Sequence, residues 1–169
     1  ALALDVDREA WPRLANRELR AMNHAHQFTV PLGDAPDGNG APDADAFCPG
    51  LARKAALVRA DDRVRRRLRE LGALYLADGE RLLHGDFHPG SWLKSAAGPR
   101  VIDPEFAFFG PPEYDLGVLV AHLKFAGDDG RSLGAYGGPG ALDTSLRDAF
   151  TGMELIRRDI RIRADKPQH

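Results

Sequence analysis

Two acidic turns in the middle of the chain limit its fold more than any other feature. The first lies in residues 83–93, Leu-His-Gly-Asp-Phe-His-Pro-Gly-Ser-Trp-Leu, and the second in residues 101–105, Val-Ile-Asp-Pro-Glu. Their leading carboxylates, Asp86 and Asp103, are 17 positions apart. This spacing suits two short strands joined by a turn, and residues 95–99 supply the turn. We therefore expect a small β-hairpin that joins one acidic loop to the other.

Acidic loops in this arrangement are typical of phosphoryl transfer from a nucleotide. One carboxylate orients the attacking hydroxyl, and other carboxylates hold the metal that bridges the phosphates. We assign Asp86 to the first task, as the catalytic base. We assign Asp103 and Glu105 to Mg²⁺, a hard cation that binds carboxylate oxygens. The simpler interpretations are that Asp86 caps a backbone amide and that the other two form an exposed acidic turn.

The same residues carry a resemblance to a known superfamily. Residues 84–88 and 102–105 resemble the catalytic and metal loops of aminoglycoside phosphotransferases and choline kinases. Within that superfamily the chain is most similar to the 5-methylthioribose kinases. This narrower similarity rests on the Gly-Ser pair at 90–91, on the run 104–111 and on the arginine pair at 157–158.

The resemblance implies an ATP-dependent kinase that uses Mg²⁺ and transfers the γ-phosphoryl group to a hydroxyl of methylthioribose, in methionine salvage. It implies that Arg157 and Arg158 bind the sugar, although adjacent arginines on a helix usually face solvent. His84 and His88 are expected to hold the catalytic loop through backbone hydrogen bonds, and Asp115 to support it from a helix start. Ser91 stands where the wider superfamily often has an Asn ligand, and its contact with the metal stays open. A homodimer is a further expectation from the resemblance.

The expected fold is the C-terminal lobe of a protein-kinase-like fold, α+β but mostly α, with the small hairpin at the active site. A kinase of this superfamily has an upstream lobe with a glycine-rich phosphate flap and a lysine on a strand. No segment before Asp86 has either pattern, and Lys54 falls at the start of a predicted helix. We therefore expect residues 1–169 to form a single substrate-binding and catalytic lobe without the ATP lobe.

Composition excludes several other classes of protein. The net charge of −2 gives no general attraction to nucleic acid or anionic membranes. The arginines within 65–69 are expected on a solvated helix face rather than at a nucleic-acid site. The single cysteine excludes an intramolecular disulfide framework and favours the cytoplasm. No apolar run approaches the roughly 20 residues of a membrane span.

The periodicity of apolar residues predicts four helices. Three of them cover about residues 8–25, 51–77 and 142–162, and another begins at residues 111–113. In the first helix Leu19 and Met22 are expected to face inward. Residues 81–83 are expected to be extended, and 31–50 to form a surface loop because prolines, glycines and aspartates interrupt any period.

Three alternatives to a methylthioribose kinase stay open. Another small-molecule kinase of the superfamily, acting on an aminoglycoside, choline or another sugar, would use the same loops. A non-catalytic lobe that acts as a binding module fits the missing ATP-lobe patterns. A metal hydrolase is suggested by the pairs His24/His26 and His84/His88, since histidines at such spacing can bind zinc.

Overall fold

The computed structural model describes residues 14–32, 50–128 and 142–162, and the account below concerns these residues. The helices are α1 (Arg17–His24), α2 (Leu51–Ala60), α3 (Asp62–Leu76), α4 (Pro112–Phe125) and α5 (Thr144–Ile162). The strands are β1 (Arg81–Leu83), β2 (Trp92–Ser95), β3 (Gly98–Val101) and β4 (Phe108–Gly110). The described part is therefore mostly helical with two small antiparallel sheets, which confirms the α+β class.

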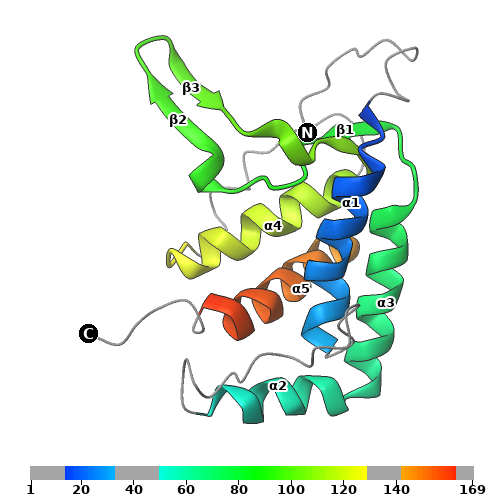
Figure 1. Ribbon diagram of the computed structural model, residues 1–169. Helices are drawn as coiled ribbons and strands as arrows, with labels where there is room; N and C mark the ends of the chain where they lie inside the picture. Colours follow the sequence, from blue (N-terminus) through cyan, green and yellow to red (C-terminus); the bar gives the residue numbers. More distant parts are fainter. Residues whose placement is uncertain (1–13, 33–49, 129–141, 163–169) are drawn as a thin grey trace.

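Helices α4 and α5 pack along each other and form the centre of the molecule, with α1 and α3 beside them (Figure 1). A cluster of aromatic side chains fills the space between these helices, with Tyr75, Phe108, Tyr114 and Phe150 almost completely buried. Gly117 allows the two central helices to approach closely. A Cβ atom at this position would lie 2.6 Å from the Cβ of Phe150, so any larger residue would push α5 away.

The two sheets hold the two acidic loops in place. Strands β2 and β3 form the predicted hairpin, which projects from the helical body as an arm (Figure 1). Strand β1, which leads into the first loop, pairs with β4, which follows the second loop. The sequence did not predict β4. This second sheet therefore hydrogen-bonds the strand before the first loop to the strand after the second loop.

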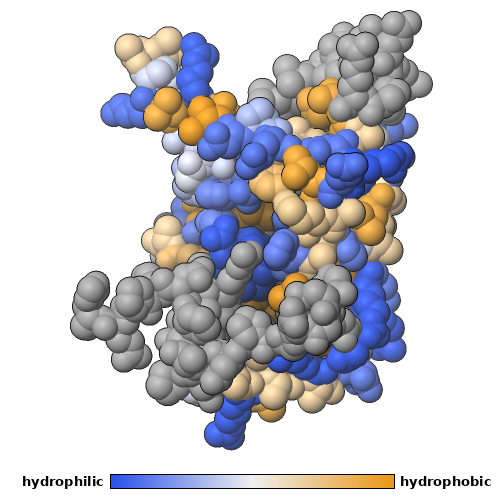
Figure 2. Space-filling model, viewed as in Figure 1, coloured by the Kyte–Doolittle hydropathy of each residue, from blue (hydrophilic) through white to orange (hydrophobic). Residues whose placement is uncertain are grey.

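The hairpin arm exposes apolar side chains. Trp92 is 40% exposed, Leu93 53% and Val101 44%. Figure 2 shows hydrophobic residues of the arm on the molecular surface, next to the charged residues of the same hairpin. The ring of Phe87, in the first acidic loop, lies 5.6 Å from the ring of Trp92. The base of the arm is thus packed against the loop, whereas the rest extends into solvent.

The single helix predicted for 51–77 is wrong, because the structure divides it at Asp61. This residue has an extended backbone conformation and its carboxylate accepts hydrogen bonds from the N–H groups of Arg63 and Val64. It is therefore the N-cap of α3. Leu68, Leu71 and Tyr75 recur at helical spacing along α3, and all three side chains are buried.

The inward positions predicted for the first helix are also wrong. Leu19 is 37% exposed and Met22 47% exposed, while Arg20 is buried. The guanidinium of Arg20 donates hydrogen bonds to the carbonyl oxygens of Tyr75 and Ala77, which close the end of α3. It also lies over the ring of Phe108, 4.4 Å from the centroid. A buried cation is tolerated here because the carbonyl oxygens at the end of α3, an aromatic face and the carboxylate of Asp78, 3.1 Å from the guanidinium, compensate its charge.

The other predicted elements are found where the sequence placed them. Residues 81–83 form β1, the helix after Pro111 is α4, and the last helix is α5. The surface loop predicted for 31–50 lies largely outside the described residues, although Pro31 and Leu32 are buried in a short 3₁₀ turn.

Candidate active site

The first acidic loop is fixed from behind by helix α4. The carboxylate of Asp115, in the first turn of that helix, accepts hydrogen bonds from the N–H groups of His84 (2.7 Å) and Gly85 (3.0 Å). Asp115 is buried, and burial raises its pKa, although the two backbone N–H groups act in the opposite direction. A buried carboxylate with two backbone donors holds the loop backbone in a single position.

The imidazole of His84 connects the loop to the end of the hairpin. Its Nε2 lies 2.8 Å from the carbonyl oxygen of Ile102, and since a carbonyl can only accept, Nε2 carries the proton. The other nitrogen, Nδ1, accepts from the backbone N–H of Asp86 at 3.3 Å. The structure therefore places His84 in contact with backbone groups of both acidic loops.

Asp86 projects from the loop with 38% of its side chain exposed, and His88 lies beside it. The Nε2 of His88 is 3.4 Å from Oδ2 of Asp86, while Nδ1 accepts from the N–H of Gly90. Because Nδ1 accepts, the proton of the neutral ring is on Nε2 and faces Asp86. Burial lowers the pKa of His88 and outweighs the opposing effect of the Asp86 carboxylate.

Ser91 is buried and its hydroxyl is engaged with the loop. It donates a hydrogen bond to the carbonyl oxygen of Asp86 at 2.9 Å. This contact closes the loop onto the short 3₁₀ turn Pro89–Ser91. In this arrangement Ser91 supports the backbone of Asp86, which gives its hydroxyl a task other than metal binding.

The second acidic loop presents its carboxylates to solvent. Asp103 has a left-handed backbone conformation (φ 59°, ψ 53°) and begins the 3₁₀ turn Pro104–Phe106, which carries Glu105. Both side chains are exposed, and within the described residues neither carboxylate forms a hydrogen bond or ion pair. The side-chain amide of Asn16 holds the backbone by donating to the carbonyl oxygens of Glu105 (2.6 Å) and Ala107 (3.2 Å).

This second loop fits a magnesium ion that takes few ligands from the protein. In the described part of the chain no group of three or more His, Cys, Asp or Glu side chains could enclose a metal. Mg²⁺ commonly binds one or two carboxylates and keeps water or phosphate oxygens on its other positions. Two unpaired carboxylates on one short turn satisfy that requirement, whereas zinc with its four close ligands would not be satisfied.

The zinc alternative is also weakened by the position of His24. Its ring stacks on Phe28, with 5.3 Å between centroids, and burial lowers its pKa. It lies in the contact between α1 and α3, near Gly72, and not beside the acidic loops. His24 is therefore a packing residue in this structure.

The arginine pair on α5 is ordered by a buried carboxylate that the sequence analysis missed. Glu154 has no exposed surface. Arg157 donates to both of its oxygens, at 2.7 and 2.6 Å, and the Nε of Arg158 donates to Oε1 at 2.8 Å. Burial acts to raise the pKa of Glu154, but neighbouring His122 and the two arginines lower it to about 2. The spacing of three and four residues on a helix was the available signal for this group.

Another residue missed by the sequence analysis, His122 near the end of α4, lies between the arginine group and the first acidic loop. Its ring is parallel to that of His88, with 4.5 Å between centroids and 10° between planes. Its Nε2 is 3.4 Å from Oε1 of Glu154. No local pattern in the sequence marks His122, because its neighbours come from residues more than 30 positions away.

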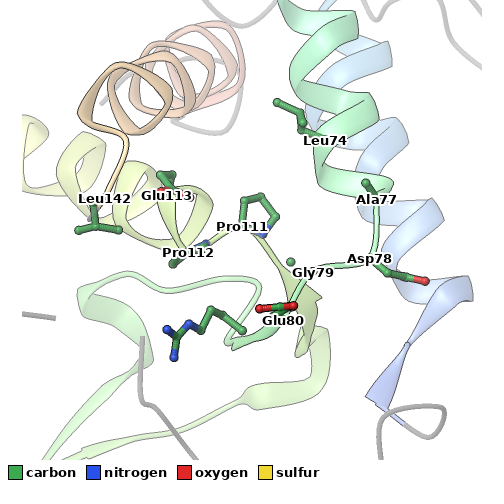
Figure 3. Close-up of a pocket in the computed structure, with 11 residues that line it drawn as sticks. Leu74, Ala77, Asp78, Gly79, Glu80, Pro111, Pro112, Glu113 and Leu142 are labelled. Atoms are coloured by element: carbon green, nitrogen blue, oxygen red, sulfur yellow. The ribbon is translucent and has the colours of Figure 1, made fainter. Parts of the chain in front are cut away.

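A separate cavity of about 420 Å³ lies between the end of α3 and the start of α4 (Figure 3). Its lining comes mainly from residues 77–81 and 110–113. None of the predicted site residues lines it, so this cavity is distinct from the acidic loops.

Comparison with known proteins identifies the family. The family model described as "Phosphotransferase enzyme family" matches residues 3–149. The chain belongs to this phosphotransferase family. Both acidic loops fall inside the matched range, and α5 continues beyond it.

Similar curated proteins of this phosphotransferase family are methylthioribose kinases. That of Geobacillus kaustophilus is 48% identical over 108 residues, covering 64% of this chain and 26% of the relative. That of Exiguobacterium sibiricum is 41% identical over 99 residues, 59% of this chain and 24% of the relative. That of Yersinia enterocolitica is 32% identical over 150 residues, 89% of this chain and 33% of the relative. The chain thus spans about a quarter to a third of the length of these relatives.

No helix in the described residues is both long and apolar enough to cross a membrane.

Proposed function

We propose that this chain forms the C-terminal catalytic and sugar-binding lobe of an ATP-dependent kinase whose acceptor is methylthioribose. The observation that carries the proposal is the joined pair of acidic loops. Asp86 stands on a backbone fixed by Asp115, and the loop with Asp103 and Glu105 is attached to it through Gly85 and the β1–β4 sheet. The similarity to methylthioribose kinases supplies the acceptor.

In this proposal each residue has a defined task. Asp86 accepts a hydrogen bond from the attacking sugar hydroxyl and takes its proton as the new bond to the γ-phosphorus forms and the bond from that phosphorus to the departing ADP breaks. The Nε2–H of His88, 3.4 Å away, keeps that carboxylate oriented. Positioning of the hydroxyl is the main contribution, because phosphoryl transfer has a loose transition state with little bond formation to the nucleophile.

Asp103 and Glu105 would hold Mg²⁺, which when bound neutralises the charge of the nucleotide phosphates. Neither carboxylate has a partner among the residues that the structure describes, which supports this assignment. Arg157 and Arg158 would bind the acceptor, since guanidinium groups direct paired hydrogen bonds toward hydroxyls and phosphate oxygens. Glu154 engages part of each guanidinium and thereby limits the directions in which the remaining N–H groups can point.

The acceptor is tested by ADP release from Mg²⁺-ATP with methylthioribose, ribose, choline and an aminoglycoside in parallel. We expect methylthioribose to support turnover at a concentration at least about tenfold lower than the others, a difference of about 1.4 kcal/mol in transition-state binding. Preference for another acceptor would replace the substrate assignment while keeping the kinase. Binding of methylthioribose by calorimetry without any ADP release would favour the non-catalytic binding module.

A further inference from the structure

His122 contacts both the ring of His88 and the carboxylate of Glu154. It belongs to α4, whereas His88 belongs to the first acidic loop and Glu154 to α5. Its side chain is 16% exposed, so it is largely enclosed by these neighbours. His88 lies beside Asp86, and Glu154 binds the arginine pair, so His122 contacts a neighbour of each part of the proposed acceptor site.

The contact with Glu154 is close but incompletely aligned. Nε2 of His122 is buried and lies 3.4 Å from Oε1, yet it forms no well-directed hydrogen bond within the described residues. A carboxylate can only accept, so Nε2 is the donor side of this contact. A buried polar atom without a full partner is costly, and a small rotation of either side chain would complete the bond.

A continuous path of contacts therefore leads from Asp86 to the arginines. Asp86 faces Nε2 of His88, and the ring of His88 is stacked on His122. His122 faces Oε1 of Glu154, the same oxygen that accepts from Arg157 and Arg158. Moving His122 would displace the carboxylate to which both guanidinium groups are bound.

We propose that His122 is a positioning residue that sets the distance between Asp86 and the arginine pair, and thereby the affinity for the acceptor. The inference rests on the proposed function, because the arginine pair binds the acceptor only if that proposal holds. The ring face and Nε2 have separate tasks. The face supports His88, and Nε2 holds Glu154.

Two variants of the 169-residue chain separate these tasks. His122→Phe keeps an aromatic face against His88 but has no polar atom for Glu154. His122→Gln keeps a donor near the position of Nε2 and loses the ring. Lys124→Gln is the matched control, since Lys124 lies on the same helix with an exposed side chain.

The first readout does not depend on turnover. It is the ¹H–¹⁵N spectrum of the arginine Nε–H groups and of the His88 imidazole. In His122→Phe we expect the Nε–H groups of Arg157 and Arg158 to shift and to exchange with solvent about tenfold faster, which corresponds to about 1.4 kcal/mol. In His122→Gln we expect these arginine signals to stay near their wild-type positions, and Lys124→Gln to change none of them. Unchanged arginine signals in His122→Phe would overturn the inference, whatever the activity.

The second readout is kinetic. His122→Phe should raise KM for the acceptor about tenfold and leave kcat and the KM for ATP within about threefold of wild type. His122→Gln should keep the acceptor KM near its wild-type value. A fall in kcat with an unchanged acceptor KM would overturn the positioning role. If the wild-type chain shows no turnover, the proposed function of the isolated chain fails, and the spectra alone then decide whether His122 holds the arginine group.

Discussion

The two acidic loops have the same kind of residue at their centre but are held in opposite ways. The loop with Asp86 is enclosed, since Asp115, His84 and Ser91 all make hydrogen bonds to its backbone. The loop with Asp103 and Glu105 is held at its start by His84, at the carbonyl of Ile102, and beyond its acidic residues by the amide of Asn16, and its carboxylates face solvent. The backbone of Asp86 is thus fixed by contacts within this chain, whereas the carboxylates of Asp103 and Glu105 are exposed, as the proposed binding of Mg²⁺ requires.

Gly85 is where the two loops meet, and replacing it should have the largest effect on stability. Its φ is 84°, and an added Cβ would collide with the carbonyl oxygen of Phe106. We expect Gly85→Ala to lower the free energy of unfolding by about 3 kcal/mol, through backbone strain and displacement of the second loop. Urea unfolding measures this loss.

Gly98→Ala is the matched control that measures the cost of backbone strain alone. Gly98 has a φ of 102° and no atom within 4 Å of an added Cβ. It should therefore cost only about 1 kcal/mol, the strain of a left-handed residue. Equal losses in the two variants would show that the loops are not in contact at Gly85.

Replacing Asp115 tests whether the loop with Asp86 depends on this buried hydrogen-bond acceptor. Asp115→Ala leaves the N–H groups of His84 and Gly85 without their acceptor, and we expect a loss of about 2 kcal/mol. Asp115→Asn, which keeps one acceptor oxygen, should lose less. Hydrogen exchange should accelerate at these two amides and stay unchanged in the turn Pro104–Phe106. Equal acceleration in both loops would contradict the separation described above.

The carboxyl of Glu154 should make the stability of the protein depend on pH in the acidic range. The pKa of this carboxyl is about 2 in the folded protein, below its ordinary value of 4.5. A lowered folded pKa gives stability that is present above pH 4.5 and lost as the pH falls toward 2. The stability advantage of wild type over Glu154→Gln, on the order of 2 kcal/mol at pH 7, should therefore shrink across this range. A difference that is constant with pH would contradict the ion pairs with the arginines.

Replacing Asn16 tests how the second loop is attached, and we expect the smallest loss of stability here. Asn16→Gly removes both hydrogen bonds to that loop and tolerates the left-handed conformation of this residue (φ 46°). We expect a loss of about 1 kcal/mol, with faster exchange at the amide of Ala107 and no change at Gly85. Asn16→Ala should lose somewhat more, because Ala is strained at this φ. Faster exchange in the enclosed loop would show that the two attachments are coupled.

Local patterns in the sequence predicted much of this architecture. The hairpin, β1, α4 and α5 follow from turn residues and apolar periodicity around residues 81–125 and 142–162. The break at Asp61 was also a local signal, since Asp-Asp before a helix is a strong cap. Residues 1–13, where the first predicted helix begins, lie outside the described residues.

Contacts between distant residues could not be predicted in this way. Strand β4 exists because Phe108 pairs with Leu83, 25 positions earlier. Arg20 is buried because its acceptors, Tyr75 and Ala77, follow more than 50 positions later. The stack of His88 on His122 is equally non-local. The sequence predicted the two acidic loops and the hairpin that joins them, and the packing of α4 and α5 determines what surrounds them. The catalytic and metal-binding roles of the acidic residues stay predictions.

The most direct test of the central claim is ADP release from Mg²⁺-ATP and methylthioribose by this chain and by its Asp86→Asn variant. Asn keeps the size of the side chain but cannot take a proton, so the fold should be retained while turnover falls at least about 100-fold. That result would assign the enclosed loop to catalysis. Measurable turnover that is equal in the two proteins would contradict the account, since Asp86 would then be no more than a loop residue.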